Sequence, residues 1–306
     1  MVERRPGVMP PRPGPPPGRP PREGVVLRRL LALAAVLAVL GAGVWLAYTA
    51  TRGTTTAAPP PATTLVTPKP FRVIFPEGFT RRQMAERVTA VAKIARRKSG
   101  VAPRISGKTY LRVTGKRRIG GFGTRLRPLE GFLFPATYDF TAKTVSRQLV
   151  KAQLDAFREN WSQLDLRYAK SKNLTPYDVL TIASMVEKET LAPDERREVA
   201  AVIYNRLHAR MPLGIDATLR YGLNIPPTRS ILQSQLASDN PYNTRKLVGL
   251  PPTPIANPGL ASMQAAVHPA KVDYLFFVRK PDRVHHYFTS SYQAFTNYER
   301  AHGYIP

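Results

Sequence analysis

Two glutamates, Glu187 and Glu189, stand at the end of an otherwise apolar run, TPYDVLTIASMVEKE, and are the first candidates for chemistry. Glu187 follows Ala183 by one helical turn and Leu180 by two, which places it at the edge of an apolar helix face. A carboxyl beside apolar side chains holds its proton more tightly, as a general acid near neutral pH requires. The alternative is an EKE triplet that faces solvent, as charge runs usually do.

The element that must position these carboxylates is predicted to be a pair of helices with a short break over residues 175–207. A Thr-Pro pair at residues 175–176 suits the start of the first helix, and Asp178 favours its positive end. Glu189 lies two residues beyond Glu187, about 200° around a helix. The two side chains are therefore expected on different faces.

The composition is strongly basic and lacks cysteine. The 306 residues include 46 Lys and Arg against 20 Asp and Glu, a formal net charge of +26. This excess predicts attraction to an anionic partner, such as nucleic acid, anionic lipid or a negatively charged wall polymer. The lack of cysteine excludes disulfides, thiolate nucleophiles and cysteine–zinc sites, and it leaves the redox compartment open.

Most other chemistries lack their motifs. The five histidines show no H-E-x-x-H spacing, so no metal site is predicted, and no cofactor is expected. The sequence has neither a G-x-S-x-G motif nor a P-loop, and GGFG at residues 120–123 is interpreted as a flexible turn. Acid–base chemistry by a carboxylate remains, and cleavage of a glycosidic bond fits it.

The first seventy residues differ sharply from the rest. Residues 1–24 are rich in Pro, Arg and Gly and predict a disordered arm. Residues 25–49 predict a single transmembrane helix, because the uncharged stretch 30–48 can cross a bilayer core of about 30 Å. Arginines precede this span, which predicts a cytoplasmic N-terminus and an extracytoplasmic remainder; a cleaved signal peptide is the alternative. The Thr- and Pro-rich residues 50–70 predict a semi-rigid linker.

Residues 71–128 predict a small basic module. A strand is expected at 71–75 and a helix at 80–99, where Thr80 and Gln83 form a capping-box pattern. The module holds sixteen Lys or Arg against two acids. It either binds an anionic surface or presents a solvated basic face.

Residues 129–306 predict a larger mixed α+β domain. The aromatic side chains of residues 129–140 are expected either in the core or on the floor of a sugar-binding groove. A long irregular loop at 240–258 suggests function, because structureless loops of that size often carry it. The other expected elements are helices at 144–160 and from 262, and a buried strand at 274–278 paired with 284–289.

Five motifs follow one another along the chain: LEGFLFPATYDF (129–140), ASMVEKET (183–190), VIYNRL (202–207), LGIDATLRYGL (213–223) and YNTRKLVGLPPTPIANPG (242–259). In this order they resemble the MltG/YceG-like endolytic peptidoglycan transglycosylases. The likeness extends from about residue 71 to the C-terminus, and FRVIFPEGFTRRQMAERV resembles the LysM-like subdomain of that family. It implies an α+β fold with a membrane anchor, a LysM-like subdomain at 71–128 and a catalytic domain at 129–306.

The resemblance implies a lyase of the cell membrane that cleaves nascent peptidoglycan between N-acetylmuramic acid and N-acetylglucosamine. The product would carry 1,6-anhydro-muramoyl ends, and glycan strand length would be limited. Glu187 would protonate the leaving oxygen and then take the proton of the muramoyl 6-hydroxyl as that oxygen attacks C1. One carboxyl suffices for this route, whereas a hydrolase usually needs two. Glu189 would have a supporting role.

The resemblance also implies substrate-binding or supporting roles for five further residues: Glu130, Asp216, Tyr242, Asn243 and Thr244. Other interpretations stay open for three of them. Asp216 could cap a helix, Asn243 could form a turn, and Glu130 could cap a local loop instead of orienting the catalytic region.

The C-terminal part departs from the family pattern at one position. Phe295 stands where the family often has a histidine, whereas His286 is retained in an expected strand.

Two other functions remain as alternatives. A non-catalytic scaffold that binds peptidoglycan beside cell-wall synthases would keep the fold without the reaction. A nucleic-acid-binding membrane protein is suggested by charge alone, but the sequence has no recognised reading motif and the expected topology puts the basic part outside the cytoplasm, so nucleic acid is not an expected partner.

Overall fold

The computed structural model describes residues 23–51, 70–99 and 102–305. The chain divides into two units, one ending at Val66 and the other spanning Thr67–Pro306. The predictions for the disordered arm and for the linker concern residues that lie almost entirely outside the described ones.

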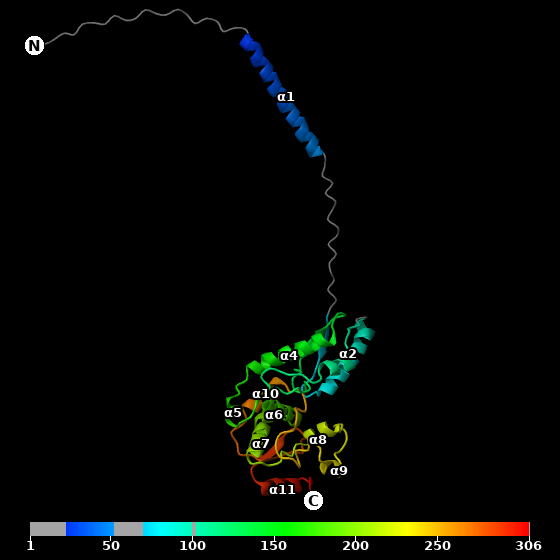
Figure 1. Ribbon diagram of the computed structural model, residues 1–306, viewed down its shortest axis with the longest axis vertical. Coiled ribbons are helices and arrows are strands. Elements are labelled where there is room, and N and C mark those ends of the chain that lie inside the picture. The colour runs from blue at the N-terminus through cyan, green and yellow to red at the C-terminus, as the bar shows by residue number, and fades with distance from the viewer. Residues whose placement is uncertain (1–22, 52–69, 100–101, 306) are drawn as a thin grey trace, which may run out of the picture. The chain divides into compact units, whose positions relative to one another are not determined.

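The first unit contributes one described element, the helix α1 (Glu23–Thr51), which contains the span expected from the sequence (Figure 1). Within it, Leu31–Thr49 is long and apolar enough to cross a membrane. The large side chains that the structure describes there are exposed, for example those of Leu37, Val39 and Trp45. An exposed apolar helix of this length is one sign of a single-pass anchor.

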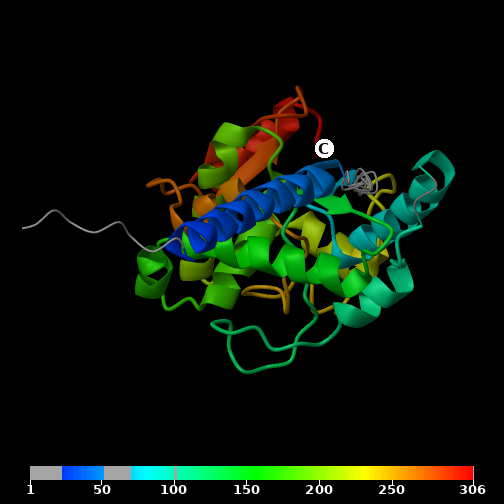
Figure 2. The same cartoon turned by 90° about the horizontal axis from the view of Figure 1, so that it is seen from above.

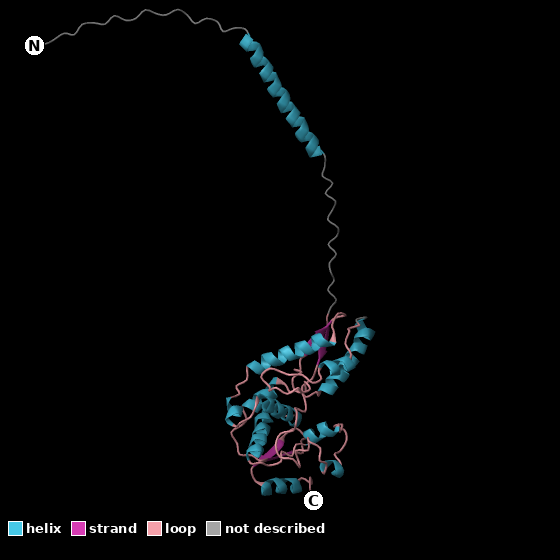
Figure 3. Cartoon of the chain, in the orientation of Figure 1, coloured by secondary structure: helices cyan, strands magenta, loops and turns pink. Residues whose placement is uncertain are grey.

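The second unit is mixed α+β, as expected, and most of its regular structure is helical (Figure 3). In chain order its elements are β1 (Phe71–Ile74), α2 (Arg81–Ser99), α3 (Gly107–Val113), β2 (Thr137–Phe140), α4 (Ser146–Ser162), α5 (Arg167–Ser171), α6 (Pro176–Glu189), the 3-10 helix η1 (Pro193–Glu195), α7 (Arg196–His208), α8 (Asp216–Leu223), α9 (Gln233–Leu236), α10 (Leu260–Val267), β3 (Phe276–Arg279), β4 (His286–Thr289) and α11 (Tyr292–Ala301).

The centre of this unit is α6, which packs against α7 and α10 (Figure 1). Every residue of α6 from Val179 to Val186 is buried. The helix begins where the sequence predicts, because Thr175 and Asp178 form a capping box: each backbone N–H donates to the side chain of the other residue, at 2.8 and 3.2 Å. The buried run ends one residue before Glu187, so the packing of α6 decides where that carboxylate emerges.

Two short antiparallel sheets flank the helices. The strand β1 pairs with β2, with Phe71 opposite Phe140. This pairing crosses the domain boundary expected at residue 128, so the basic module shares its sheet with the segment that follows it. The strand β3 pairs with β4 as predicted.

The helix α2 confirms the capping box and the buried stripe expected from its sequence. The Thr80 N–H donates to Gln83 at 2.8 Å, and the Gln83 N–H donates back to Thr80 at 3.2 Å. Met84 and Val88 on the inner face are fully buried. This packing joins α2 to α3 in one small helical layer.

The loop that follows α3 extends along α4 (Figure 2), and it carries the GGFG segment. Gly121 and Gly123 have positive φ angles of 84° and 87°, which agrees with the predicted turn. Between them, Phe122 is buried, and its ring centroid lies 4.9 Å from that of Phe132 and 4.9 Å from that of Trp161. The turn therefore anchors the loop to the core, which the sequence did not predict.

The strand predicted to be buried at 274–278 is displaced and less covered than expected. It occupies Phe276–Arg279, and its apolar side chains are half-buried. The helix α11 covers it, with Phe295 packed 5.3 Å from Phe276 between ring centroids.

Candidate active site

Glu187 lies in the last turn of α6, where the buried part of the helix ends, and its side chain is half-buried. Its Oε2 accepts the N–H of Gly259 at 3.1 Å, at the start of α10. Its Cγ lies 3.6 Å from the position that a β-carbon on Gly78 would occupy. Glu187 is thus held between the turn after β1 and the N-terminus of α10.

Asn257 fixes the turn that faces Glu187. The Gly78 N–H donates to the Asn257 carbonyl at 3.0 Å, and the Asn257 N–H and side-chain amide both donate to the Phe79 carbonyl at 2.9 and 2.8 Å. The Asn257 side-chain oxygen accepts the Leu133 N–H at 2.9 Å. Because Asn257 is fully buried and every polar group of its side chain is used, it locks the basic module onto the rest of the unit.

Glu77 is a second carboxylate in this place, and sequence reasoning missed it. The residue is exposed, and its carboxylate lies against Gly259, the residue that also binds Glu187. Partial burial and the nearby charge of Glu187 raise its pKa, and Arg196 partly offsets the shift. The only signal in the sequence was an acid standing nearly alone among the sixteen bases of the module.

Glu189 points to a different face from Glu187, as the helical spacing predicts. It accepts the N–H of Ala217 at the start of α8. Burial and, to a smaller extent, the charge of Asp216 raise the pKa of Glu189 to about 7, and Arg279 opposes the shift. Its carboxyl therefore secures the end of α6 to the start of α8.

Asp216 is the first residue of α8, in the place where the sequence allowed a helix cap. The cap position itself is Ile215, and the Asp216 carboxylate instead pairs with the Arg245 guanidinium at 2.5 Å. Both side chains are partly exposed, so this pair lies at the surface beside half-buried Glu189.

Glu130 is a buried hub between the basic module and the remaining helices. Its Oε1 accepts the N–H of Arg81 at 2.8 Å and the side-chain amide of Asn257 at 3.1 Å, and its Oε2 accepts the Tyr221 hydroxyl at 3.0 Å. Burial raises the pKa of Glu130 to about 7, although these hydrogen bonds favour the ionised form. Its bond to the first turn of α2 spans 49 residues of the chain, so Glu130 caps a distant helix and not a local loop.

The three residues of the Tyr-Asn-Thr motif differ in exposure. Tyr242 is half-buried, with its hydroxyl 2.8 Å from that of Thr253 and its ring against Tyr221. Asn243 is fully buried and donates to the carbonyls of the preceding loop. Thr244 is buried and accepts the Ile215 N–H at 3.1 Å. Asn243 and Thr244 are therefore closed off from solvent, and Tyr242 is the member of the motif that keeps exposed surface.

His286 lies in β4, and its partner is Glu195 of η1. The two side chains are buried, with 2.7 Å between Nδ1 and Oε2, and the other oxygen of Glu195 accepts the His286 N–H at 2.8 Å. Phe295 belongs to the aromatic contact between α11 and β3.

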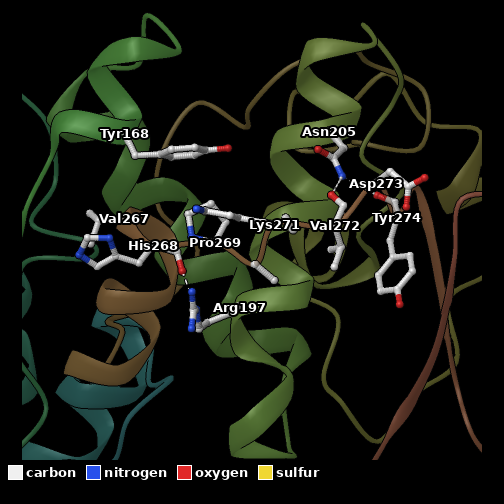
Figure 4. Close-up of a pocket in the computed structure, with 12 residues that line it drawn as sticks. Tyr168, Arg197, Asn205, Val267, His268, Pro269, Lys271, Val272, Asp273 and Tyr274 are labelled. Atoms are coloured by element: carbon white, nitrogen blue, oxygen red, sulfur yellow. Dashed lines mark hydrogen bonds between the residues drawn. The ribbon is translucent and has the colours of Figure 1, made fainter.

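A pocket of about 660 Å³ lies away from Glu187 and does not include it in its lining. It lies beside α5, α7 and the chain that follows α10 (Figure 4). Two of its polar side chains already bind backbone carbonyls: Arg197 donates to His268 at 2.8 Å and Asn205 to Val272 at 2.9 Å. Among the residues that the structure describes, no three His, Asp or Glu side chains converge as ligands for a metal ion.

This fold and this site define a class: a mixed α+β protein that presents a carboxylate from the end of a buried helix, beside a second carboxylate from a neighbouring turn. The chain belongs to the YceG-like family, whose model matches residues 48–301.

Known relatives agree with this assignment. The chain is 34% identical over 220 residues to an endolytic murein transglycosylase of Bacillus subtilis, covering 69% of this chain and 59% of the relative. It is 35% identical over 222 residues to an endolytic murein transglycosylase of Streptococcus pneumoniae, covering 66% of this chain and 39% of that protein. The chain thus spans less than two thirds of the length of either relative. A crystal structure of a yceG-like protein from Listeria monocytogenes matches with a TM-score of 0.61 and 28% identity, over 74% of this chain and 75% of that one.

Proposed function

We propose that this protein is an endolytic transglycosylase that cleaves peptidoglycan strands without water and leaves 1,6-anhydro-muramoyl ends. The observation that carries the proposal is the setting of Glu187: a half-buried carboxylate that directly follows the buried run of α6 and is oriented by the Gly259 N–H. Membership of the YceG-like family and the murein transglycosylases among its relatives supply the substrate class.

In the proposed reaction Glu187 first donates its proton to the glycosidic oxygen between muramic acid and glucosamine. The C1–oxygen bond of the muramoyl residue breaks, and positive charge develops at C1. The muramoyl 6-hydroxyl then attacks C1, and its proton passes to the Glu187 carboxylate, which restores the acid. The chain supplies one proton and takes one back, so neither metal nor cofactor enters the balance.

Glu189 is assigned a supporting role in this scheme. Its carboxyl binds the Ala217 N–H on another face of α6, so it holds the end of the helix that carries Glu187. Glu130 is assigned a similar role through its contacts to Arg81, Tyr221 and Asn257. Tyr242, half-buried beside Tyr221, is the member of its motif with surface left for glycan.

The test compares the full chain in detergent with its Glu187→Gln variant, each incubated with uncrosslinked glycan strands. Mass spectrometry of the products should find anhydro-muramoyl ends with the wild type and none with the variant. Glu86→Gln, at an exposed position of α2, is the matched control and should cleave like the wild type. Cleavage that survives in Glu187→Gln would reject the assignment of the acid.

The second candidate is a peptidoglycan-binding scaffold that works beside cell-wall synthases. It is favoured if glycan strands retain the wild type in a pull-down assay and yet no new chain ends are generated. The oriented and accessible Glu187 favours the enzyme, because a binding scaffold has no need for it.

We further propose that α1 anchors the chain in the cell membrane with its N-terminus in the cytoplasm. The proposal is supported by the apolar stretch Leu31–Thr49 and by the arginines before it. The strand and helices of residues 71–128 would act as a LysM-like subdomain that binds glycan, and their positive charge would favour anionic lipid or wall polymers.

A further inference from the structure

Gly259 brings two carboxylates together. Its N–H donates to Oε2 of Glu187 at 3.1 Å. A β-carbon at this position would lie 1.9 Å from Oε1 of Glu77 and 2.7 Å from its Oε2. The Glu77 carboxylate therefore occupies the space that any other residue at 259 would fill with a side chain. Glu77 comes from the basic module and Glu187 from α6, so their meeting is a product of the tertiary fold.

The backbone does not require glycine at this position. Gly259 has φ −77° and ψ 171°, which every residue adopts readily. What excludes a side chain is the Glu77 carboxylate, since the three atoms nearest to the added β-carbon all belong to Glu77. Glycine here makes room for a carboxylate.

The turn that carries Glu77 is built rigidly against the site. Gly78 has φ +73°, donates its N–H to Asn257 at 3.0 Å, and accepts Lys188 Nζ at 3.4 Å. A flexible surface glutamate would not need this support. Glu77 nevertheless remains exposed, so a glycan that reaches Glu187 can also reach Glu77.

We propose that Glu77 is a second carboxylate of the active site, contributed by the basic module, and that Gly259, which has no side chain, leaves the space that this carboxylate occupies. The inference rests on the proposed transglycosylase function. In that reaction Glu187 moves the proton, and ionised Glu77 stabilises the positive charge that develops at C1 as the glycosidic bond breaks. Glu77 forms no covalent bond and transfers no proton, so the balance of the reaction is unchanged.

The charged groups that act on Glu77 are Glu187 from α6 and Arg196 from α7, and Lys188 donates to the carbonyl of the adjacent Gly78. Partial burial and Glu187 raise the pKa of Glu77, and Arg196 lowers it. Since the ionised form is the active one, the rate of the wild type should fall as the pH drops through this raised pKa. A variant without the carboxyl should lack that acidic limb.

The first experiment measures cleavage by the full chain in detergent for the wild type, Glu77→Gln and Glu86→Gln. We expect Glu77→Gln to lower kcat at least about tenfold, with little change in KM and without the acidic limb. Glu86→Gln, an exposed acid of the same module, should match the wild type. Thermal unfolding should be the same for all three, because Gln keeps the size and shape of Glu.

Gly259→Ala provides an independent readout. Its methyl group should displace the flexible end of Glu77 and leave the N–H that binds Glu187, so the variant should lose a similar factor in kcat. In a Glu77→Gln background the same substitution should cost nothing more, since neighbouring residues with one shared role are not additive.

The inference and the proposed function fail in different ways. Full activity and an unchanged pH profile in Glu77→Gln would overturn the role of Glu77, while anhydro ends from the wild type would leave the transglycosylase in place. Additive losses in the double variant would overturn the claim that Gly259 acts by leaving space for the Glu77 carboxylate. The absence of anhydro ends from every variant, wild type included, would overturn both.

Discussion

Three of the carboxyl groups with raised pKa values lie in three different settings. Glu130 is buried among hydrogen-bond donors, Glu189 closes the contact between two helices, and Glu77 is exposed beside Glu187. In each case burial is the largest cause. A pKa shift in the same direction therefore accompanies a structural contact in one place and a candidate catalytic group in another, and the difference lies in whether substrate can reach the carboxyl.

Glu130 should make stability depend on pH. Its pKa is about 7 in the folded protein against 4.5 when unperturbed, so the unfolded chain ionises first as the pH rises. Below about pH 4.5 the group adds no pH dependence. As the pH rises from about 4.5 to 7, the free energy of unfolding of the wild type should fall by roughly 3 kcal/mol relative to that of Glu130→Gln, whose side chain does not titrate. Denaturant unfolding of both proteins across this range measures the difference. Parallel curves would contradict the prediction.

Glu130→Ala separates the hydrogen bonds from the charge. It leaves the N–H of Arg81, the amide of Asn257 and the hydroxyl of Tyr221 without their acceptor. Relative to Glu130→Gln, we expect a pH-independent loss of free energy of unfolding of about 1–3 kcal/mol for each buried donor that water cannot reach. A variant as stable as Glu130→Gln would show that water replaces the carboxyl.

Asp216 should influence the titration of Glu189. The charge of Asp216 raises the Glu189 pKa, so Asp216→Asn should lower it from about 7. Carbon-13 NMR of the side-chain carboxyls follows the titration directly. As a control, Asp239→Asn removes an exposed acid that pairs with Lys246 and should leave Glu189 unchanged. An unmoved Glu189 titration in Asp216→Asn would contradict the coupling.

At the scale of elements, α6 carries the site because its packing is tight. Leu180 is fully buried in α6, whereas Leu191, just after the helix, is 60% exposed. Leu180→Ala should lower the free energy of unfolding by about 2–5 kcal/mol through lost burial and a cavity. Leu191→Ala should change it by less than about 0.5 kcal/mol. Equal effects in denaturant unfolding would mean that α6 is not the core of the unit.

The helices could be predicted from the sequence because their signals are local. The capping box at Thr80, the helix start at Thr175 and the apolar spacing of α6 lie within a few residues, and the structure confirms them. The β3–β4 pair was predicted for the same reason, although the extent to which the side chains of β3 are buried was not. Burial of β3 depends on α11, and a strand pattern does not reveal what covers it.

The parts of the site that were missed depend on distant contacts. Lys188 and Gly78 are 110 residues apart in the sequence and meet beside Glu187. The position of Glu77 follows from such contacts, and its own sequence neighbourhood shows only a turn. Likewise, the motif that contains Asn243 and Thr244 indicated importance without showing that both side chains are buried. Resemblance identifies residues that matter, whereas packing decides whether they touch a ligand or hold the protein together.

At the scale of the whole molecule, the positive charge should determine whether the protein binds to anionic lipid. The segment from Arg72 to Arg127 holds sixteen basic and two acidic residues, and many of its bases are exposed, including Arg82, Arg96 and Lys108. A chain that begins at Thr67 should bind vesicles with anionic lipid at low salt and dissociate as ionic strength rises. Sedimentation with vesicles measures this binding. Equal binding to uncharged vesicles, insensitive to salt, would contradict an electrostatic origin.

The central claim is that a carboxylate of this chain cleaves glycan without water, and isotope labelling tests it most directly. The full chain would digest glycan strands in water enriched in oxygen-18, and mass spectrometry would read the new muramoyl ends. The account predicts ends that are lighter than reducing ends by one water and carry no label, absent with Glu187→Gln. Reducing ends that carry one labelled oxygen would mean hydrolysis and would contradict the account.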